Sequence, residues 1–383
     1  MKRWWARAAL LGIGALIGLA VSEIFARVYF RHLTEDFVVR SEDLYYYNDA
    51  HGVRHHVPGK VGFEKSWDGV GRVAVRINSH GLRGPEISLP KSAGVRRLLI
   101  LGDSVTLSGH TREEDTFVSL LQEKLLRDGA TGVEVLNAGV GNVGLREEKD
   151  FLESLLSLDP SVVVLVWYLN DARPPLGFPE ENVYANPIIR FVNRSECLHR
   201  SVLVRLLYEK TKNWLIRKGI EGSRSLQSGY EWVTAFNEGR WRSSPSEFRR
   251  MVQLARFDWG DAWNESHLNW SAREILELNQ RLRKRKMRFG VVLAPVWPQV
   301  AIRTSDPFLQ FPQRTLAAVC QRAGIPVLDL AEALRPRASA DMFFDQCHFT
   351  PTGNRAVAEC LARFLKEARM VSDGSETGGE RFQ

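Results

Sequence analysis

The sequence predicts an α/β fold, a doubly wound parallel sheet with helices packed around it. Short apolar runs bounded by glycine or polar residues recur from Val95 onwards, as in buried parallel strands. Stretches with apolar residues at helical spacing separate these runs, and this alternation is typical of a parallel sheet. Strands are predicted at Arg97–Leu101, Val133–Asn137, Val162–Trp167, Phe289–Ala294 and Ile325–Leu328. Helices are predicted at Phe117–Arg127, Glu147–Leu156, Ala272–Lys286, Gln313–Ala323 and Gly353–Ala368.

The first 30 residues have the pattern of an export signal. Three basic residues near the start precede a charge-free run, Ala8–Ser22, and the small residues Gly18-Leu19-Ala20 resemble a cleavage site. Glu23 and Arg27 follow, four positions apart, and can pair on one helical face. We expect an uncleaved membrane anchor that keeps its positive end inside and exports the remainder. A cleaved signal peptide, which would release a secreted protein, and a buried soluble helix are the alternatives.

Residues 31–94 form a lead-in rich in aromatic residues, histidine, glycine and proline. Short alternating runs such as Val73–Ile77 predict irregular strands packed on the main domain. The histidines here, His55, His56 and His80, have no nearby cluster of carboxylates or cysteines. They are therefore expected to be structural, and no metal site is predicted.

The stretch Arg96–Thr106, RRLLILGDSVT, places a serine where a strand of the predicted sheet ends. Gly102 provides the turn, and Asp103 and Ser104 follow it. Reactive groups of open α/β sheets lie beyond the carboxyl ends of the strands, so Ser104 is a candidate nucleophile. An Asp-Ser pair in this place is also typical of a simple turn and helix cap.

A base that could activate this serine lies near the other end of the chain. Asp345-Gln346-Cys347-His348 follows two phenylalanines and precedes the last predicted helix. In a turn, Asp345 and His348 can face each other, so the carboxylate orients the imidazole while it takes a proton from Ser104. Cys347 is an alternative nucleophile, but the serine at the strand end fits the chemistry better.

These segments resemble the motif blocks of the SGNH/GDSL hydrolase family. The first and fifth blocks resemble Gly102-Asp103-Ser104-Val105 and Asp345-x-x-His348. The third, normally Gly-x-Asn-Asp, is similar to Tyr168-Leu169-Asn170-Asp171, with tyrosine in place of glycine. The second falls in Asn137–Asn142, where the family's glycine position is occupied by Asn142. Asn78–Gly84 is similar to the NSxGxRG lead-in of some exported members, and the whole resemblance covers about 76–180 and 288–368.

The resemblance implies a flavodoxin-like domain and ester chemistry. It implies catalytic roles for Ser104, His348 and Asp345. It also implies an oxyanion hole formed by the Ser104 N–H, an N–H near Gly141 and Asn142, and the Asn170 amide. Asparagine tolerates left-handed backbone well, so Asn142 can still offer a backbone donor. An Asx turn into Asp171 is the structural alternative for Asn170.

The region 177–271 interrupts the strand–helix alternation with about 95 residues that contain no strong strand. Its position after the third block predicts a helical cap over the active site. The region contains six tryptophans, Trp214, Trp232, Trp241, Trp259, Trp263 and Trp270. They could contact sugars or an acyl chain, or they could pack the core of the cap. The predicted division is 1–30 (signal segment), 31–94 (lead-in), 95–176 and 272–370 (core), 177–271 (cap) and 371–383 (disordered tail).

Composition sets limits on partners. A net charge of +7 admits an acidic partner, but no nucleic-acid module accompanies the basic run Arg281–Arg288, which reads as the last turn of a helix. The four cysteines, Cys197, Cys320, Cys347 and Cys360, lack metal-ligand spacing. Mostly buried thiols are expected, with one or two disulfides as the alternative. No cofactor, metal or nucleic acid is therefore predicted, and the sequence specifies no protein partner.

Three functions are open. The first is hydrolysis of carboxylic esters through an acyl-enzyme, on an O-acylated envelope glycan or lipid. The second is O-acetyl transfer to an exported polysaccharide, with a sugar hydroxyl replacing water as the acceptor. The third is a non-catalytic glycan-binding scaffold, against which the joint presence of Ser104, Asn170, Asp345 and His348 argues.

Overall fold

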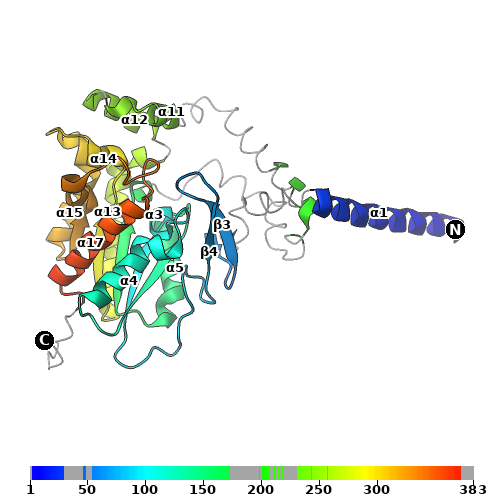
Figure 1. Cartoon of the computed structure of the whole chain (residues 1–383), viewed down its shortest axis with the longest axis horizontal. Coiled ribbons are helices and arrows are strands. Elements are labelled where there is room, and N and C mark those ends of the chain that lie inside the picture. Colours follow the sequence, from blue (N-terminus) through cyan, green and yellow to red (C-terminus); the bar gives the residue numbers. More distant parts are fainter. Residues whose placement is uncertain are drawn as a thin grey trace.

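A computed structural model describes residues 2–29, 46–48, 54–172, 231–242, 244–256 and 258–371. It also describes residues 198, 201–204, 206, 207, 210, 211, 214 and 218. Cys197, most of the first part of the predicted cap and nearly all of the predicted tail lie outside these residues. Figure 1 shows a layered α/β body from which a long N-terminal helix, α1 (Lys2–Tyr29), extends away.

The body is built on a five-stranded sheet in the order β6-β5-β7-β8-β9, and every pairing is parallel. Its strands are β5 (Arg96–Gly102), β6 (Val133–Gly139), β7 (Val162–Trp167), β8 (Arg288–Leu293) and β9 (Val327–Asp329). Numbered by their order in the chain, they run 2-1-3-4-5, the flavodoxin-like arrangement. The strand order reverses between β5 and β7. Sheets of this kind bind ligands in the crevice beyond the carboxyl ends of the two strands at the reversal.

Helices cover the sheet on both sides, as the sequence predicts (Figure 1). In one layer, α4 (Phe117–Arg127) packs against α17 (Pro351–Glu367). In the other, α13 (Glu265–Lys284) packs against α5 (Leu145–Leu155) and α15 (Phe311–Arg322). Short helices α3 (Ser104–Leu107), α14 (Trp297–Ala301) and α16 (Leu330–Leu334) follow β5, β8 and β9.

The predicted elements are largely confirmed, with differences at their ends. The bounds of β7 and α4 are those predicted. Helix α13 begins at Glu265 rather than Ala272, because the side chain of Asn264 caps it by accepting the Ser266 N–H over 3.1 Å. The first turns of α13 are polar, so apolar residues at helical spacing do not indicate this start. Strand β9 begins at Val327, two residues later than predicted.

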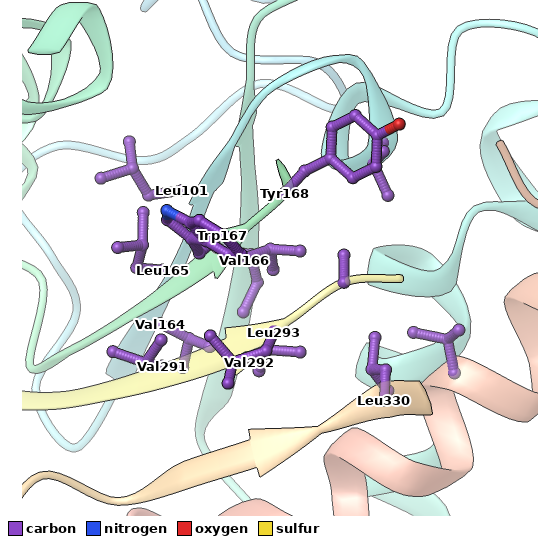
Figure 2. Packing of buried hydrophobic residues seen from close by; sticks show 14 of the residues in the cluster. Leu101, Val164, Leu165, Val166, Trp167, Tyr168, Val291, Val292, Leu293 and Leu330 are labelled. Atoms are coloured by element: carbon purple, nitrogen blue, oxygen red, sulfur yellow. The ribbon is translucent and has the colours of Figure 1, made fainter. Parts of the chain in front are cut away.

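The central strand β7 is fully apolar. All six residues of β7 are buried, and Figure 2 shows Val164, Val166 and Trp167 packed among side chains of the neighbouring strands. The Trp167 indole N–H donates to the Ser271 hydroxyl over 2.7 Å, so this buried polar group is satisfied. A strand that is buried on both faces reads as a continuous apolar run, which is why β7 is evident from sequence.

The lead-in forms two antiparallel pairs, β1 (Tyr46–Asn48) with β2 (Arg54–His56) and β3 (Val61–Lys65) with β4 (Arg72–Arg76). After β4, the chain turns inward, and Arg83 bridges to Asn137 of β6. The lead-in is thereby attached beside the carboxyl end of the sheet.

The described part of the predicted cap is helical, with α11 (Glu231–Asn237) and α12 (Pro245–Leu254) followed by the 3-10 helix η6 (Trp259–Trp263). Three of its tryptophans, Trp232, Trp241 and Trp259, are buried. Trp232 packs edge-on to Trp259, and Trp241 packs against Trp297 of the core. These three side chains therefore pack the interior, whereas Trp214 is exposed.

Among the described residues, one helix is long and apolar enough to cross a membrane, Trp4–Tyr29 within α1, with a mean hydropathy of 2.1. None of its most apolar window is buried against the body. Cys320, Cys347 and Cys360 are buried free thiols, as expected for three of the four cysteines.

Candidate active site

The turn after β5 presents Ser104 at the first position of α3. Asp103 caps this helix, because its Oδ1 accepts the Val105 N–H over 2.9 Å. A side chain at Gly102 would collide with Thr106, and one at Gly139 would collide with the backbone of Leu107. The two glycines therefore let the nucleophile helix approach the strand ends closely.

Ser104, His348 and Asp345 come together in one hydrogen-bonded chain. His348 Nε2 lies 2.9 Å from Ser104 Oγ, and His348 Nδ1 lies 2.7 Å from Asp345 Oδ2. The imidazole thus connects the hydroxyl to the carboxylate through its two nitrogens. This is the arrangement that allows a histidine to take a proton from a serine.

The loop before α17 fixes the histidine. Asp345 Oδ1 accepts the backbone N–H of Cys347 over 2.9 Å and that of His348 over 2.7 Å, so the carboxylate is held by its own turn. The ring of Phe344 stacks on the imidazole at a centroid distance of 5.7 Å, and His110 meets it edge-on at 5.5 Å. The ring is thereby held on two sides.

The charges of this pair stabilise each other. Burial alone would lower the pKa of His348, but the adjacent Asp345 carboxylate outweighs it and raises the pKa well above the ordinary 6.5. Burial would likewise raise the pKa of Asp345, but the imidazolium and its hydrogen bonds lower it. An imidazolium is therefore favoured while the pair is intact.

Asn170 lies just beyond β7 in the 3-10 helix η4 (Leu169–Ala172). Its Nδ2 donates to Asp103 Oδ2 over 3.2 Å, which brings the amide to the nucleophile turn. An amide nitrogen carries two hydrogens, so one contact with Asp103 leaves the second for another acceptor. In the same turn, Asp171 Oδ2 accepts the Tyr168 N–H over 2.8 Å. Asn170 Oδ1 accepts no hydrogen bond from the described residues, so Asn170 forms no Asx turn.

Gly141 and Asn142 lie in the loop after β6, at the same edge of the sheet. Asn142 has a left-handed backbone with φ of +58°, the conformation its residue type tolerates. The Gly141 carbonyl accepts a hydrogen bond from Arg54 of the lead-in over 3.2 Å. Within the described parts of the chain, the backbone N–H groups of Ser104 and Asn142 have no acceptor.

Sequence reasoning missed a group of buried acidic residues behind this site. Asp103, Glu148 and Asp171 are all buried. Burial, reinforced by the charges of Asp171 and Asp103, raises the pKa of Glu148 well above its ordinary value. Burial also raises the pKa of Asp103, against the effect of its hydrogen bonds. Helical spacing from Leu145 was the available signal, because it places Glu148 on the apolar face of α5.

Arg83 is a second residue whose contacts were not predicted. It is 3% exposed and donates to the carbonyls of Leu107, Ser108 and Thr111 over 2.5–2.7 Å. One guanidinium therefore holds the chain that leaves α3. The similarity of Asn78–Gly84 to a known lead-in motif marks this arginine but does not reveal its partners.

Asp345, Cys347 and His348 also offer three potential metal-ligand atoms within 4.8 Å of one another. Two of these atoms already belong to the hydrogen-bonded chain with Ser104. Burial raises the pKa of the Cys347 thiol to about 12, so this sulfur stays protonated and is a weak ligand. The donor set therefore fits the serine arrangement better than a metal.

The sequence matches no family model and no curated protein. Solved structures do match, over most of their own length. The acetyl xylan esterase AlAXEase is 16% identical, with a TM-score of 0.38, over 69% of this chain and 97% of that chain. TesA is 14% identical, with a TM-score of 0.38, over 71% of this chain and 99% of that chain. Axe2, an acetylxylan esterase from Geobacillus stearothermophilus, is 14% identical, with a TM-score of 0.39, over 70% and 94%.

A lipolytic protein of the G-D-S-L family from Desulfitobacterium hafniense also matches, at 12% identity, with a TM-score of 0.38 over 70% of this chain and 99% of that chain. The predicted doubly wound fold is shown by the sheet itself, through its parallel strand order. At these identities and TM-scores, any conclusion about activity has to come from the geometry of the site itself.

Proposed function

We propose that the protein is a serine-dependent hydrolase of carboxylic esters. The observation that carries the proposal is the continuous chain from Ser104 Oγ through both nitrogens of His348 to Asp345, with contacts of 2.9 and 2.7 Å. A serine that only served to start a helix would need no such base. Ser104, His348 and Asp345 act as nucleophile, general base and orienting carboxylate.

In the first half of the reaction, neutral His348 accepts the Ser104 proton at Nε2 while Oγ attacks the ester carbonyl carbon. The carbonyl oxygen becomes an oxyanion, and the carbonyl double bond re-forms as the alkoxide leaves. The imidazolium gives its proton to that alkoxide, and the acyl group remains on Ser104. In the second half, water loses a proton to His348 and attacks the acyl carbon. The bond from that carbon to Ser104 Oγ then breaks, the imidazolium gives its proton to Oγ, and the carboxylic acid leaves.

The oxyanion requires donors that are already in place. Three groups supply them in this proposal: the N–H of Ser104, the N–H of Asn142 and the second amide hydrogen of Asn170. The support is that the two backbone groups have no acceptor among the described residues, and that Asp103 orients the Asn170 amide. Gly141 shapes the loop that presents Asn142.

The substrate that we propose is an O-acylated glycan or lipid of the cell envelope. Support comes from α1, which is long and apolar enough to span a membrane and begins with Lys2 and Arg3. Positive residues stay on the cytoplasmic side, so the body would face outward. The predicted alternative, transfer of an acetyl group to an exported polysaccharide, shares the same acyl-enzyme and differs only in the acceptor.

A fluorophosphonate probe tests the nucleophile directly. We expect covalent labelling of the full-length protein in detergent, mapped by peptide mass to Ser104, and no labelling of Ser104→Ala. Ser92→Ala, at an exposed serine, is the matched control and is expected to label normally. A wild-type protein that does not react would overturn the proposal and favour a non-catalytic scaffold.

Product analysis then identifies the acceptor. With an activated acetyl ester, release of acetate that is unaffected by added polysaccharide supports hydrolysis. Appearance of acetylated polysaccharide at the expense of acetate would show transfer instead.

A further inference from the structure

The carboxylate of Glu23 joins α1 to the segment that begins at Ser201. Glu23 Oε2 accepts the Ser201 hydroxyl over 2.8 Å and the Leu203 N–H over 3.0 Å. Glu23 Oε1 accepts the Val202 N–H over 3.0 Å. The described residues between 202 and 218 are helical, so these are N–H groups that a helix leaves unsatisfied at its start. A residue 178 positions away in the chain therefore caps this helix.

The contact includes the neighbouring turn of α1. Arg27 donates to the same Glu23 carboxylate over 2.8 Å, which balances its charge. Ala26 is 3% exposed, although the apolar residues around it in α1 are exposed. The end of α1 is therefore covered on one side, and Glu23 on the same turn contacts the Ser201 segment.

This contact lies at the level where the apolar part of α1 ends. Residues 8–22 carry no charge, and Glu23 and Arg27 are the first charged residues after them. Charged groups in a spanning helix sit near the membrane–water boundary. If α1 spans the membrane as proposed above, the helix capped by Glu23 starts at the outer membrane surface.

The exposed side of that helix has a composition suited to a lipid surface. Leu207 and Trp214 are 60% and 53% exposed, and Lys210 and Lys218 are exposed as well. Each of the four is helical, and their spacings of three and four residues are those of neighbours on one helical face. Residues 200–218 contain six basic residues and one acidic residue. Tryptophan, leucine and lysine on one face are typical of helices that lie in the membrane interface.

We propose that the face formed by Leu207, Lys210, Trp214 and Lys218 lies on the outer surface of an anionic membrane. Leu207 and Trp214 enter the boundary between headgroups and acyl chains, and Lys210 and Lys218 face lipid phosphates. This proposal rests on the proposed membrane position of α1. Its consequence is a second attachment, locked to the first by Glu23, that fixes the orientation of the body relative to the bilayer.

The test uses the full-length chain reconstituted into phosphatidylcholine vesicles with or without phosphatidylglycerol. Cys197 is replaced by serine, the other three cysteines being buried, and single cysteines carry an environment-sensitive fluorophore. The labelled positions are Leu207→Cys, Trp214→Cys, Leu16→Cys within α1, and Leu126→Cys on the exposed side of α4 as the matched control. Quenching by lipids with a nitroxide on the acyl chain reports membrane insertion.

We expect lipid quenching at 207 and 214, none at 126, and stronger quenching at 214 when phosphatidylglycerol is present. The pair Lys210→Glu and Lys218→Glu should reduce quenching at 214 about twofold or more. Glu23→Ala should do the same while leaving quenching at 16 intact. Ester hydrolysis of a soluble substrate should be unchanged in all of these variants, which confirms folding.

Quenching at 16 together with a label at 214 that behaves like the one at 126 would overturn this proposal and leave the anchor standing. Shielding of 214 from aqueous iodide without lipid quenching would also overturn it, because a protein surface would then cover the face. No quenching at 16 would overturn both the anchor and the surface helix, but not the proposed chemistry at Ser104.

Discussion

The side-chain nitrogen of Asn170 lies 3.2 Å from Oδ2 of Asp103, the residue directly before Ser104. The other oxygen of Asp103 accepts the Val105 N–H and so caps α3. One buried carboxylate therefore orients both the helix that carries the proposed nucleophile and the amide that we propose as an oxyanion donor. Asp103, the motif residue before the serine, therefore has a structural role.

This relationship sets the expected effect of removing the amide. Asn170→Ala takes away one oxyanion donor, which typically costs about 2.7–4 kcal/mol of transition-state stabilisation. We expect kcat to fall roughly 100-fold or more, with KM little changed, because the donor acts mainly on the transition state. Asn269→Ala, at an exposed asparagine of α13, is the control. Equal kcat values for the two variants would remove Asn170 from the oxyanion hole.

The pH dependence of the reaction follows from the His348–Asp345 pair. The base must be neutral, and the Asp345 carboxylate raises the pKa of His348 above 6.5. The rate of reaction with a fluorophosphonate should therefore rise with pH through an apparent pKa above that value. Asp345→Asn removes the charge that stabilises the imidazolium, so the rise should move to lower pH.

The same substitution also removes the group that selects the imidazole tautomer, and the rate should fall about 10⁴-fold. Rates measured across the pH range for both proteins test both effects. An unshifted profile in Asp345→Asn would mean that the carboxylate does not control the histidine.

The positions that sequence could predict are those set by local pattern. The apolar run of β7 and the spacing of α4 gave both elements with their observed bounds. Because parallel strands end at one edge of the sheet, Ser104 and Asn170 could also be assigned to that edge. Their contact through Asp103 could not be foreseen, since it depends on how two separate strand ends meet.

Contacts between distant segments were the main omission. The guanidinium of Arg83 reaches three carbonyls after α3, and Glu23 caps a helix far along the chain. No periodicity encodes such partners, because each depends on the packing of the whole fold. The six tryptophans of the predicted cap illustrate the same limit, since composition alone did not separate the buried Trp259 from the exposed Trp214.

Arg83 should matter for stability and for the position of Ser104. Lysine has a single charged nitrogen and cannot reproduce the fork that holds the Leu107, Ser108 and Thr111 carbonyls. Each buried acceptor left without a donor costs about 1–3 kcal/mol, so Arg83→Ala should lower the free energy of unfolding by roughly 3 kcal/mol or more. Denaturant titration in detergent measures this.

Arg83→Lys tests the effect on the position of Ser104 separately from the effect on stability. We expect a partial loss of stability and a kcat reduced about 10-fold or more, since small displacements of a nucleophile are costly. Arg76→Lys, at an exposed arginine of β4, should be neutral in both measurements. Wild-type kcat in Arg83→Lys would show that the contacts serve folding alone.

Because Glu148 is buried, the free energy of unfolding should fall as the pH rises. The residue is 1% exposed and has no hydrogen-bond partner within the described ranges, and burial followed by the charges of Asp171 and Asp103 raises its pKa. In the unfolded chain, a glutamate loses its proton near 4.5, whereas in the folded protein the proton is kept to higher pH. Between these two values, the folded state binds more protons, so stability falls as pH increases.

Glu148→Gln keeps the shape of the side chain and removes this proton from the balance. Its amide can also donate to the neighbouring carboxylates. We expect a melting temperature at neutral pH higher than that of the wild type by roughly 2 °C or more. The difference should vanish below the ordinary glutamate pKa, where both states of the wild type are protonated. Glu123→Gln, on the exposed face of α4, is the control and should not change the melting temperature at either pH. If the melting temperatures of Glu148→Gln and the wild type differed by the same amount at every pH, Glu148 would not be held protonated by the fold.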